Sequence, residues 1–276
     1  MVTSAVSSAA AHWPQIGDIL QNHSGGRPDP TSDLAGKSFG ISLNDGGRLD
    51  LAFSTAEFLS WSAAGAGGHE RQPYQAFRVR DGMYFVDFID ANDEMRSISL
   101  WLDLARNAAL LIEGSVSDRT AEDMNLLTRV EKTGAQSVPT LTYRSGGIGR
   151  SLPDFPRTEK LFGKFFRYEY SDTHVYDHYY VNPKYYFWYC WHGPDAGIGE
   201  FDEADYFELA DDVYLICWRE KFLPCLAVTI EDLSTMRSIG KVFGADSHTW
   251  RTGNSTVGAT MSIIAAIPPG PAGSPA

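Results

Sequence analysis

The sequence predicts an all-β fold made of two tandem antiparallel β-barrel units. Its apolar residues recur with period two, or in short runs bounded by Gly, Asn and Asp, which is typical of strands. A set of segments occurs twice in the same order. The length of 276 residues suits two domains, and the composition, 43% hydrophobic and 13% aromatic, is that of a chain with a sizeable core.

The repeat sets the domain boundaries. Leu34–Phe39 recurs as Leu161–Phe166, each followed by a strand, a turn and a second strand. Tyr84–Phe88 matches Tyr214–Trp218, at offsets of 127 and then 130 residues, so that order and spacing are kept. We therefore expect a lead-in over 1–30, an N-terminal half over 31–115, a connecting region over 116–157, a C-terminal half over 158–267 and a disordered tail over 268–276.

The connecting region is less regular than the two halves. We expect strands at 125–131 and 140–144, with a short helix over 118–128 as the alternative to the first. Each half is otherwise a meander of antiparallel strands, and meanders hide their edges by closing into barrels. A barrel of about eight strands has room for one small ligand.

Charge and composition limit the classes of binding partner. The formal net charge of −12 and the pI of 5.0 argue against nucleic acid and anionic membranes. Eight carboxylates without Lys or Arg lie between Asp195 and Asp212, and we interpret them as a solvated loop and strand edge. No calcium-loop spacing is present there. A homo-oligomer is left open.

Targeting signals are not evident. The N-terminal residues lack the basic stretch of a signal peptide, and no run reaches the ~18 apolar residues of a membrane helix. Cys190, Cys217 and Cys225 lie in apolar surroundings, which favours buried free thiols. We expect a cytoplasmic protein.

The C-terminal half carries the candidate site. Eight of the 13 tyrosines lie between Tyr168 and Tyr189. Alternation along the expected strands assigns their faces. The inward-facing set is Phe166, Tyr168 and Tyr170 on one strand, Tyr176, His178 and Tyr180 on the next, and Tyr214, Ile216, Trp218 and Glu220 on a third.

Glu220 is the candidate acid. A carboxyl group in line with aromatic side chains is desolvated, which raises its pKa and suits it to proton transfer. The alternative is a solvated Glu220 neutralised by Arg219 and Lys221, in a wall that only packs. His178 and His192 are more typical of a core or rim than of a base. The spacing of His174 and Asp177 fits no metal motif, so we expect neither metal nor cofactor.

Several of these segments resemble the molybdenum cofactor biosynthesis protein F (MoaF) family over residues 30–248. They are Leu34–Lys37, Tyr84–Phe88, Tyr176–Tyr180, Tyr206–Phe207, Tyr214–Glu220 and Ser238–Gly244. The resemblance implies a calycin- or lipocalin-like fold and no established reaction.

The C-terminal half also distantly resembles the phenolic acid decarboxylases, which are cofactor-free calycin barrels. That family's pattern is met by Gly163, Tyr168, Tyr170, Tyr176, Tyr214, Trp218 and Glu220. The resemblance implies that Tyr168 and Tyr170 hold a substrate carboxylate and that Glu220 is the acid/base group. The family's arginine is missing near Ile198, which puts decarboxylation in doubt.

Two functions follow as hypotheses. The first is a cofactor-independent lyase or isomerase with Glu220, Tyr168 and Tyr170 as catalytic residues. Substrate-binding residues would be Tyr176, His178, Tyr180, Trp218 and Tyr214, and the substrate a small aromatic or phenolic molecule. The second is a non-catalytic small-molecule-binding or accessory protein linked to molybdenum cofactor biosynthesis, although an anionic pterin precursor would need basic groups that the C-terminal half offers sparsely.

Overall fold

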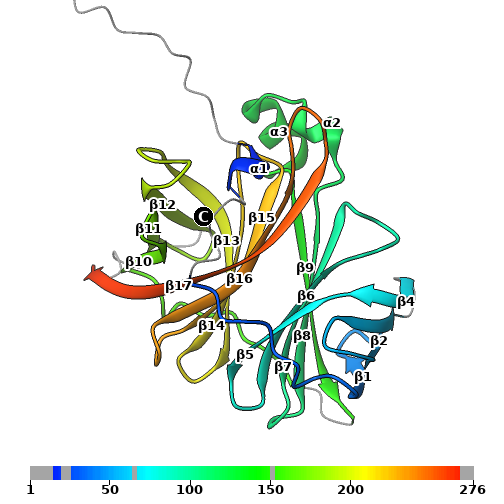
Figure 1. Cartoon of the computed structure of the whole chain (residues 1–276). Coiled ribbons are helices and arrows are strands. Elements are labelled where there is room, and N and C mark those ends of the chain that lie inside the picture. Colours follow the sequence, from blue (N-terminus) through cyan, green and yellow to red (C-terminus); the bar gives the residue numbers. More distant parts are fainter. Residues whose placement is uncertain (1–14, 20–25, 64–66, 150–152, 268–276) are drawn as a thin grey trace, which may run out of the picture.

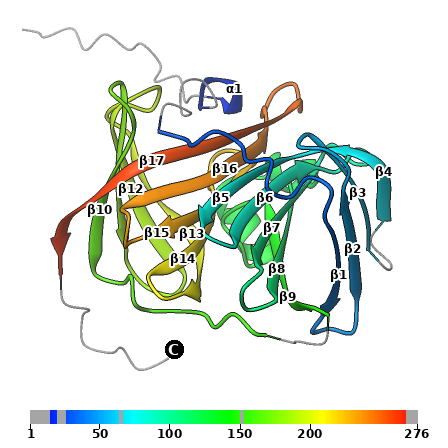
Figure 2. The same cartoon turned by 60° about the horizontal axis from the view of Figure 1, so that its bottom comes forward.

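The computed structural model describes residues 15–19, 26–63, 67–149 and 153–267. The expected tail over 268–276 and most of the lead-in lie outside the described residues. Two antiparallel β-sheets stand side by side, one from each half (Figures 1 and 2). The predicted all-β fold with two barrel-like units is confirmed.

The N-terminal half forms a nine-stranded sheet that nearly closes. Along the sheet the strand order is β4-β3-β2-β1-β9-β8-β7-β6-β5. Its strands are β1 (Ser38–Leu43), β2 (Arg48–Phe53), β3 (Phe58–Ala63), β4 (Gly67–Pro73), β5 (Gln75–Arg80), β6 (Met83–Ile89), β7 (Arg96–Asp103), β8 (Ala108–Ser115) and β9 (Thr140–Ile148). The two ends of the ladder, β4 and β5, are consecutive in the chain and are joined through Tyr74.

The C-terminal half forms a closed barrel in which the strands follow one another in chain order. They are β10 (Lys164–Ser171), β11 (His174–Tyr180), β12 (Tyr185–His192), β13 (Gly199–Ala210), β14 (Val213–Arg219), β15 (Cys225–Asp232), β16 (Arg237–Ala245) and β17 (Thr252–Ala266). The 12-residue β13 takes the place of β4 and β5 together, so the closed barrel lacks the break at Tyr74.

Equivalent turns open the two halves. Gly36 and Gly163 both have a left-handed backbone, with φ of 77° and 81°. The Gly36 N–H donates to the carbonyl of Phe53 at 2.7 Å, and the Gly163 N–H donates to that of Tyr180 at 2.9 Å. Phe53 and Tyr180 each end the second strand of their half. The repeat read from the sequence therefore extends to backbone hydrogen bonds.

The connecting region contains helices where we expected a strand. α2 (Arg119–Glu122) and α3 (Leu126–Thr133) replace the strand predicted at 125–131, so that prediction was wrong. Asp118 and Asn125 cap the two helices by accepting from backbone N–H groups, and Gly134 ends α3 with φ of 74°. The second predicted strand exists as β9, and it pairs with β1 and β8.

The two halves pack through equivalent outward faces. Two cross-strand rows meet in one buried apolar cluster, Phe77-Phe85-Trp101-Leu110 from β5–β8 and Phe207-Leu215-Ile230-Ile239 from β13–β16. Each residue of the first row has the same strand position as its counterpart in the second. The contact therefore resembles the self-complementary interface of a twofold dimer within one chain.

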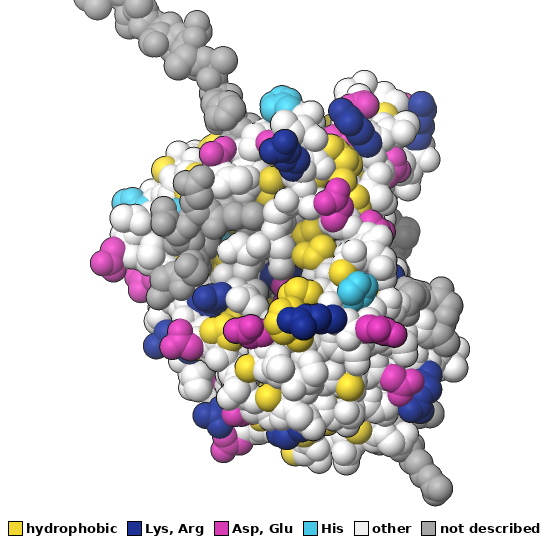
Figure 3. Space-filling model, turned by 45° about the vertical axis from the view of Figure 1, so that its right-hand side comes forward, with side chains coloured by type: hydrophobic (Ala, Val, Ile, Leu, Met, Phe, Trp, Pro, Cys, Tyr) yellow, Lys and Arg dark blue, Asp and Glu magenta, His cyan; other side chains and the backbone are white. Residues whose placement is uncertain are grey.

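The surface shown in Figure 3 is mixed in charge. Acidic and basic side chains are interspersed over that face, and hydrophobic side chains gather only in small groups.

Candidate functional site

The closed barrel contains a narrow cavity near one end of its strands. Its volume is 50 Å³, enough for a few water molecules. The described residues that line it are Ile19, Tyr170, Tyr176, His178, Tyr186, Trp188, Asp195, Trp218, Glu220, Val242 and Val257. Five of the eight predicted site residues, Tyr170, Tyr176, His178, Trp218 and Glu220, are thus brought together. The alternation that predicted inward faces is confirmed by their place in the barrel core.

Tyr168 and Tyr180 belong instead to a buried hydrogen-bond network beside the cavity. Their hydroxyls are 2.5 Å apart, and Tyr168 donates to Glu231 Oε2 at 2.7 Å. Thr229 donates to Glu231 Oε1 at 3.1 Å. Burial raises the pKa of Glu231 to about 7. The Tyr168 ring packs on His178 with 4.2 Å between centroids, so this network supports the cavity wall.

Tyr214 is inward but lies at the far end of β14 from Glu220. It pairs with Glu231 across β15, whereas Glu220 follows directly after β14. Six residues of strand span roughly 20 Å. Tyr214 is not among the described residues that line the cavity.

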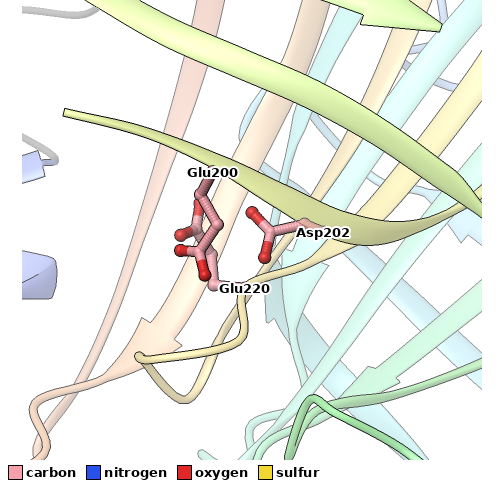
Figure 4. A group of neighbouring side chains, drawn as sticks. All are labelled: Glu200, Asp202 and Glu220. Atoms are coloured by element: carbon pink, nitrogen blue, oxygen red, sulfur yellow. The ribbon is translucent and has the colours of Figure 1, made fainter. Parts of the chain in front are cut away.

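Three carboxyl groups converge at the cavity. Atoms of Glu200, Asp202 and Glu220 lie within 4.8 Å of one another, and Figure 4 shows the three side chains pointing together. Glu200 and Asp202 are 5% and 0% exposed. The acidic stretch after Asp195 is thus not the solvated edge that we predicted. It lies largely on β13, where alternation aligns Glu200 and Asp202 with the inward Tyr206.

Mutual repulsion and burial keep this acidic cluster partly protonated. Two like charges at this distance cost on the order of 3 kcal/mol at an effective dielectric constant of about 20. Burial, then the neighbouring Asp202, Glu200 and Asp195, hold the pKa of Glu220 well above its usual range. Burial and Glu200 raise the pKa of Asp202 to about 8. Burial and the neighbouring carboxyl groups therefore favour the protonated form of Glu220 over its carboxylate.

Asp202 and Glu200 are held by different partners. Trp188 Nε1 donates to Asp202 at 2.7 Å, and the Lys221 N–H donates to its other oxygen at 3.0 Å. Lys221 Nζ lies 2.8 Å from Glu200 Oε1. The second oxygen, Glu200 Oε2, is buried without a hydrogen-bond partner among the described residues.

His178 lines the cavity and carries a further unsatisfied polar atom. It is 4% exposed, and its Nδ1 has no hydrogen-bond partner in the described part of the chain. Burial lowers the pKa of His178 to about 3, so the ring is neutral. A buried polar atom left unpaired costs about 1–3 kcal/mol.

The mouth of the cavity is covered by α1 (Ile16–Ile19). Ile19 forms part of the wall, and Ile16 is buried with Leu223 and Cys225. Gln15 accepts from the backbone N–H and hydroxyl of Ser247. A cavity that takes a ring the size of benzene needs about 150 Å³. A ligand of that size needs more room than the described wall residues leave.

Sequence reasoning missed several wall residues. Asp195 accepts from the Tyr176 hydroxyl at 2.7 Å, and its pKa is raised by burial. It lies in the loop after β12, whose position depends on the whole barrel. Strand alternation, by contrast, predicts the inward positions of Tyr186 and Trp188 along β12. It equally predicts those of Glu200 and Asp202 along β13.

The three cysteines are buried and free, as predicted. Burial raises the pKa of the Cys190 thiol to about 11, so it is no ready nucleophile.

Comparison with known proteins supplies the family. Residues 11–118 match the MoaF N-terminal domain, and residues 155–267 match the MoaF C-terminal domain. Over 234 residues the chain is 32% identical to Protein MoaF of Klebsiella aerogenes. The aligned region covers 83% of this chain and 86% of that protein. The chain belongs to the MoaF family. The expected resemblance is confirmed, and apart from Ile19 the residues that line the cavity lie in the part that matches the MoaF C-terminal domain.

A solved structure is also similar, at lower level. A putative beta-lactamase from Burkholderia vietnamiensis aligns with a TM-score of 0.33 and 19% identity, over 40% of this chain and all of that chain. Within the described residues of this chain, no helix is long and apolar enough to cross a membrane.

Proposed function

We propose that this MoaF-family protein binds a small molecule in the closed barrel and transfers protons to and from it, acting as a cofactor-independent lyase or isomerase on an aromatic or phenolic substrate. The observation that carries the proposal is the position of Glu220. Its carboxyl group lines the cavity, and burial together with Asp202 and Glu200 raises its pKa well above the usual range, which favours the protonated form. A positioned carboxylic acid of this kind is a general acid.

The neighbouring carboxyl groups complete the proton balance. Once Glu220 has given its proton to the substrate, its carboxylate lies within 4.8 Å of Asp202, whose pKa is about 8. In an isomerisation, the cluster removes a proton from one substrate atom and returns one to another. In an elimination, the removed proton leaves with the departing group. The aromatic walls exclude water and orient a planar substrate.

The network around Tyr168 argues against decarboxylation. A substrate carboxylate held by Tyr168 would meet the Glu231 carboxyl group, which already accepts from that hydroxyl at 2.7 Å. The supporting residues are therefore Tyr170 and Tyr176 for binding and Glu220 for chemistry. Tyr168 and Tyr180 are positioning residues under this proposal, because they act through His178.

A ligand screen followed by one substitution tests the proposal. Thermal-shift measurements with phenols, aromatic aldehydes and aromatic amines identify ligands, since binding stabilises the native state by mass action. On a confirmed substrate, Glu220→Gln should lower turnover at saturating substrate by about 10²–10⁴-fold. Glu169→Gln, an exposed change on the outward face of β10, should have no effect. Full turnover in Glu220→Gln would favour a non-catalytic binding or accessory protein.

A further inference from the structure

The lining of the cavity is acidic and carries no basic counterpart. Asp195 and Glu220 line it, and none of its described lining residues is Lys or Arg. Glu200 and Asp202 lie directly beside Glu220. The ammonium group of Lys221 is held by Glu200. An anionic ligand would therefore meet carboxyl groups on entry, whereas a cation would meet no Lys or Arg among the described lining residues.

The rest of the wall is aromatic, and its rings stand at angles to one another. Tyr186 and Trp218 are 5.3 Å apart and inclined by 47°, and Tyr176 and Trp188 are 6.2 Å apart and inclined by 52°. The Tyr170 ring meets Tyr176 edge-on, with an angle of 87°. Rings arranged around a space, rather than stacked on each other, present faces and edges to it. The faces of Trp and Tyr rings attract organic cations.

Two unsatisfied acceptors accompany these rings. His178 Nδ1 and Glu200 Oε2 are buried, and neither has a hydrogen-bond partner among the described residues. A neutral imidazole can accept from an ammonium N–H. Carboxyl groups and an unpaired imidazole nitrogen beside aromatic rings match the chemistry of a protonated amine.

We propose that the ligand of this cavity is a small organic ammonium ion, with its charged nitrogen against Glu220 and Asp195 and its organic part between the aromatic rings. The proposal rests on the proposed function, because it takes the same cavity as the site and narrows the substrate to an amine. It also makes an anionic pterin precursor a poor ligand.

Cation binding should release protons from the acidic cluster. The titratable and charged groups around Glu220 are Glu200, Asp202, Asp195, Lys221, Tyr186 and Cys225, with Asp18 of α1 near Asp195. A cation favours the ionised form of Glu220 and Asp202. Because the ligand binds the deprotonated cluster more tightly, affinity should rise as the pH rises from 6 to 8.

Three probes that share one ring and differ in charge test the proposal. The affinities of benzylammonium, benzyl alcohol and benzoate are measured by calorimetry at pH 7.5 on the full chain. Ile19→Ala, which adds room at the mouth, is measured beside the native protein. Benzylammonium should bind at least about tenfold more tightly than benzyl alcohol, the usual gain of a charge-assisted hydrogen bond, and benzoate most weakly.

Substitutions locate the contact. Glu220→Gln and Asp195→Asn should each weaken benzylammonium binding by about tenfold and leave benzyl alcohol within twofold, while Glu169→Gln changes neither. Asp195 lies in a loop, so Asp195→Asn provides the test if the Glu220→Gln variant does not fold. Equal affinity for the alcohol, tighter binding of benzoate, or no binding of benzylammonium to either protein overturns the ammonium assignment. The proposed proton transfer is tested separately, by measuring the turnover of Glu220→Gln on whichever substrate the ligand screen finds.

Discussion

Lys241 Nζ lies 2.7 Å from Asp87 Oδ1, and this ion pair joins the two halves of the chain at a site where both side chains are 1% exposed. Lys241 is on β16 and Asp87 on β6. Asp87 also accepts from Ser99 at 3.1 Å and from Asn254 at 2.8 Å. Burial lowers the pKa of Lys241. A charge in this position is stable only with its partner.

Removing the cation should therefore be costly. Lys241→Met is expected to lower the free energy of unfolding by about 3–5 kcal/mol, because it leaves Asp87 buried without compensation. Adding Asp87→Asn should restore part of the loss, since no charge then remains. Urea unfolding measures both. Lys160→Met, which breaks an exposed pair with Glu208, is the control and should cost about 0–1 kcal/mol. Equal losses for the two lysines would contradict this account.

Glu231→Gln should change how stability depends on pH. The pKa of Glu231 is raised to about 7 in the folded chain against 4.5 when unfolded, so its contribution is full below pH 4.5 and is lost as the pH rises through 7. Glutamine imitates the protonated form. Between pH 4.5 and pH 8, the free energy of unfolding of the variant should rise by about 3 kcal/mol relative to that of the native protein. Urea unfolding across that range checks this, and a constant difference would rule it out.

Gly240→Ala should destabilise the closed barrel severely. A Cβ at Gly240 would lie 2.3 Å from the carbonyl oxygen of Val228 and 2.7 Å from the Cα of Thr229, both backbone atoms of the neighbouring strand. The backbone would have to move, at an expected cost of about 3 kcal/mol or more. Gly17→Ala is a fair control, since nothing lies within 4 Å of its added Cβ. Equal changes in the melting temperature for Gly240→Ala and Gly17→Ala would contradict the close approach of the two strands at Gly240.

Ile16→Ala should loosen α1 from the barrel. Ile16 packs on Leu223 and Cys225, so its truncation should expose the Cys225 thiol more often. We expect labelling of Cys225 by a thiol reagent to accelerate about tenfold, the effect of losing part of a buried aliphatic side chain. Labelling of Cys190 and Cys217 serves as the internal reference, and mass spectrometry of peptides separates the three sites. Parallel acceleration at all three would indicate global unfolding instead.

Sequence patterns predicted which way side chains face better than how far along the barrel they lie. Alternation correctly assigned Tyr168, Trp218 and Glu220 to the interior, because period two is a property of the strand itself. It could not tell that Tyr214 lies at the opposite end from Glu220. Depth in a barrel depends on strand tilt and register, which pairing partners determine.

Charge was the misleading signal. A run of carboxylates is usually solvated, and that expectation concealed the inward positions of Glu200 and Asp202. Continuing the alternation backwards from Tyr206 would have found both. The helices of the connecting region were likewise readable from Asp118, Asn125 and Gly134 as caps.

The packing of equivalent faces raises the question of which halves can pack on each other. By strand register Asp87 corresponds to Cys217, and Lys241 corresponds to Ile112. Two N-terminal halves from neighbouring nascent chains would thus bury Asp87 opposite an isoleucine, and two C-terminal halves would bury Lys241 opposite a cysteine. Each mismatch leaves a desolvated charge unpaired, at a cost of several kcal/mol. The ion pair therefore favours the packing of an N-terminal half on a C-terminal half, and it disfavours the packing of two like halves on each other.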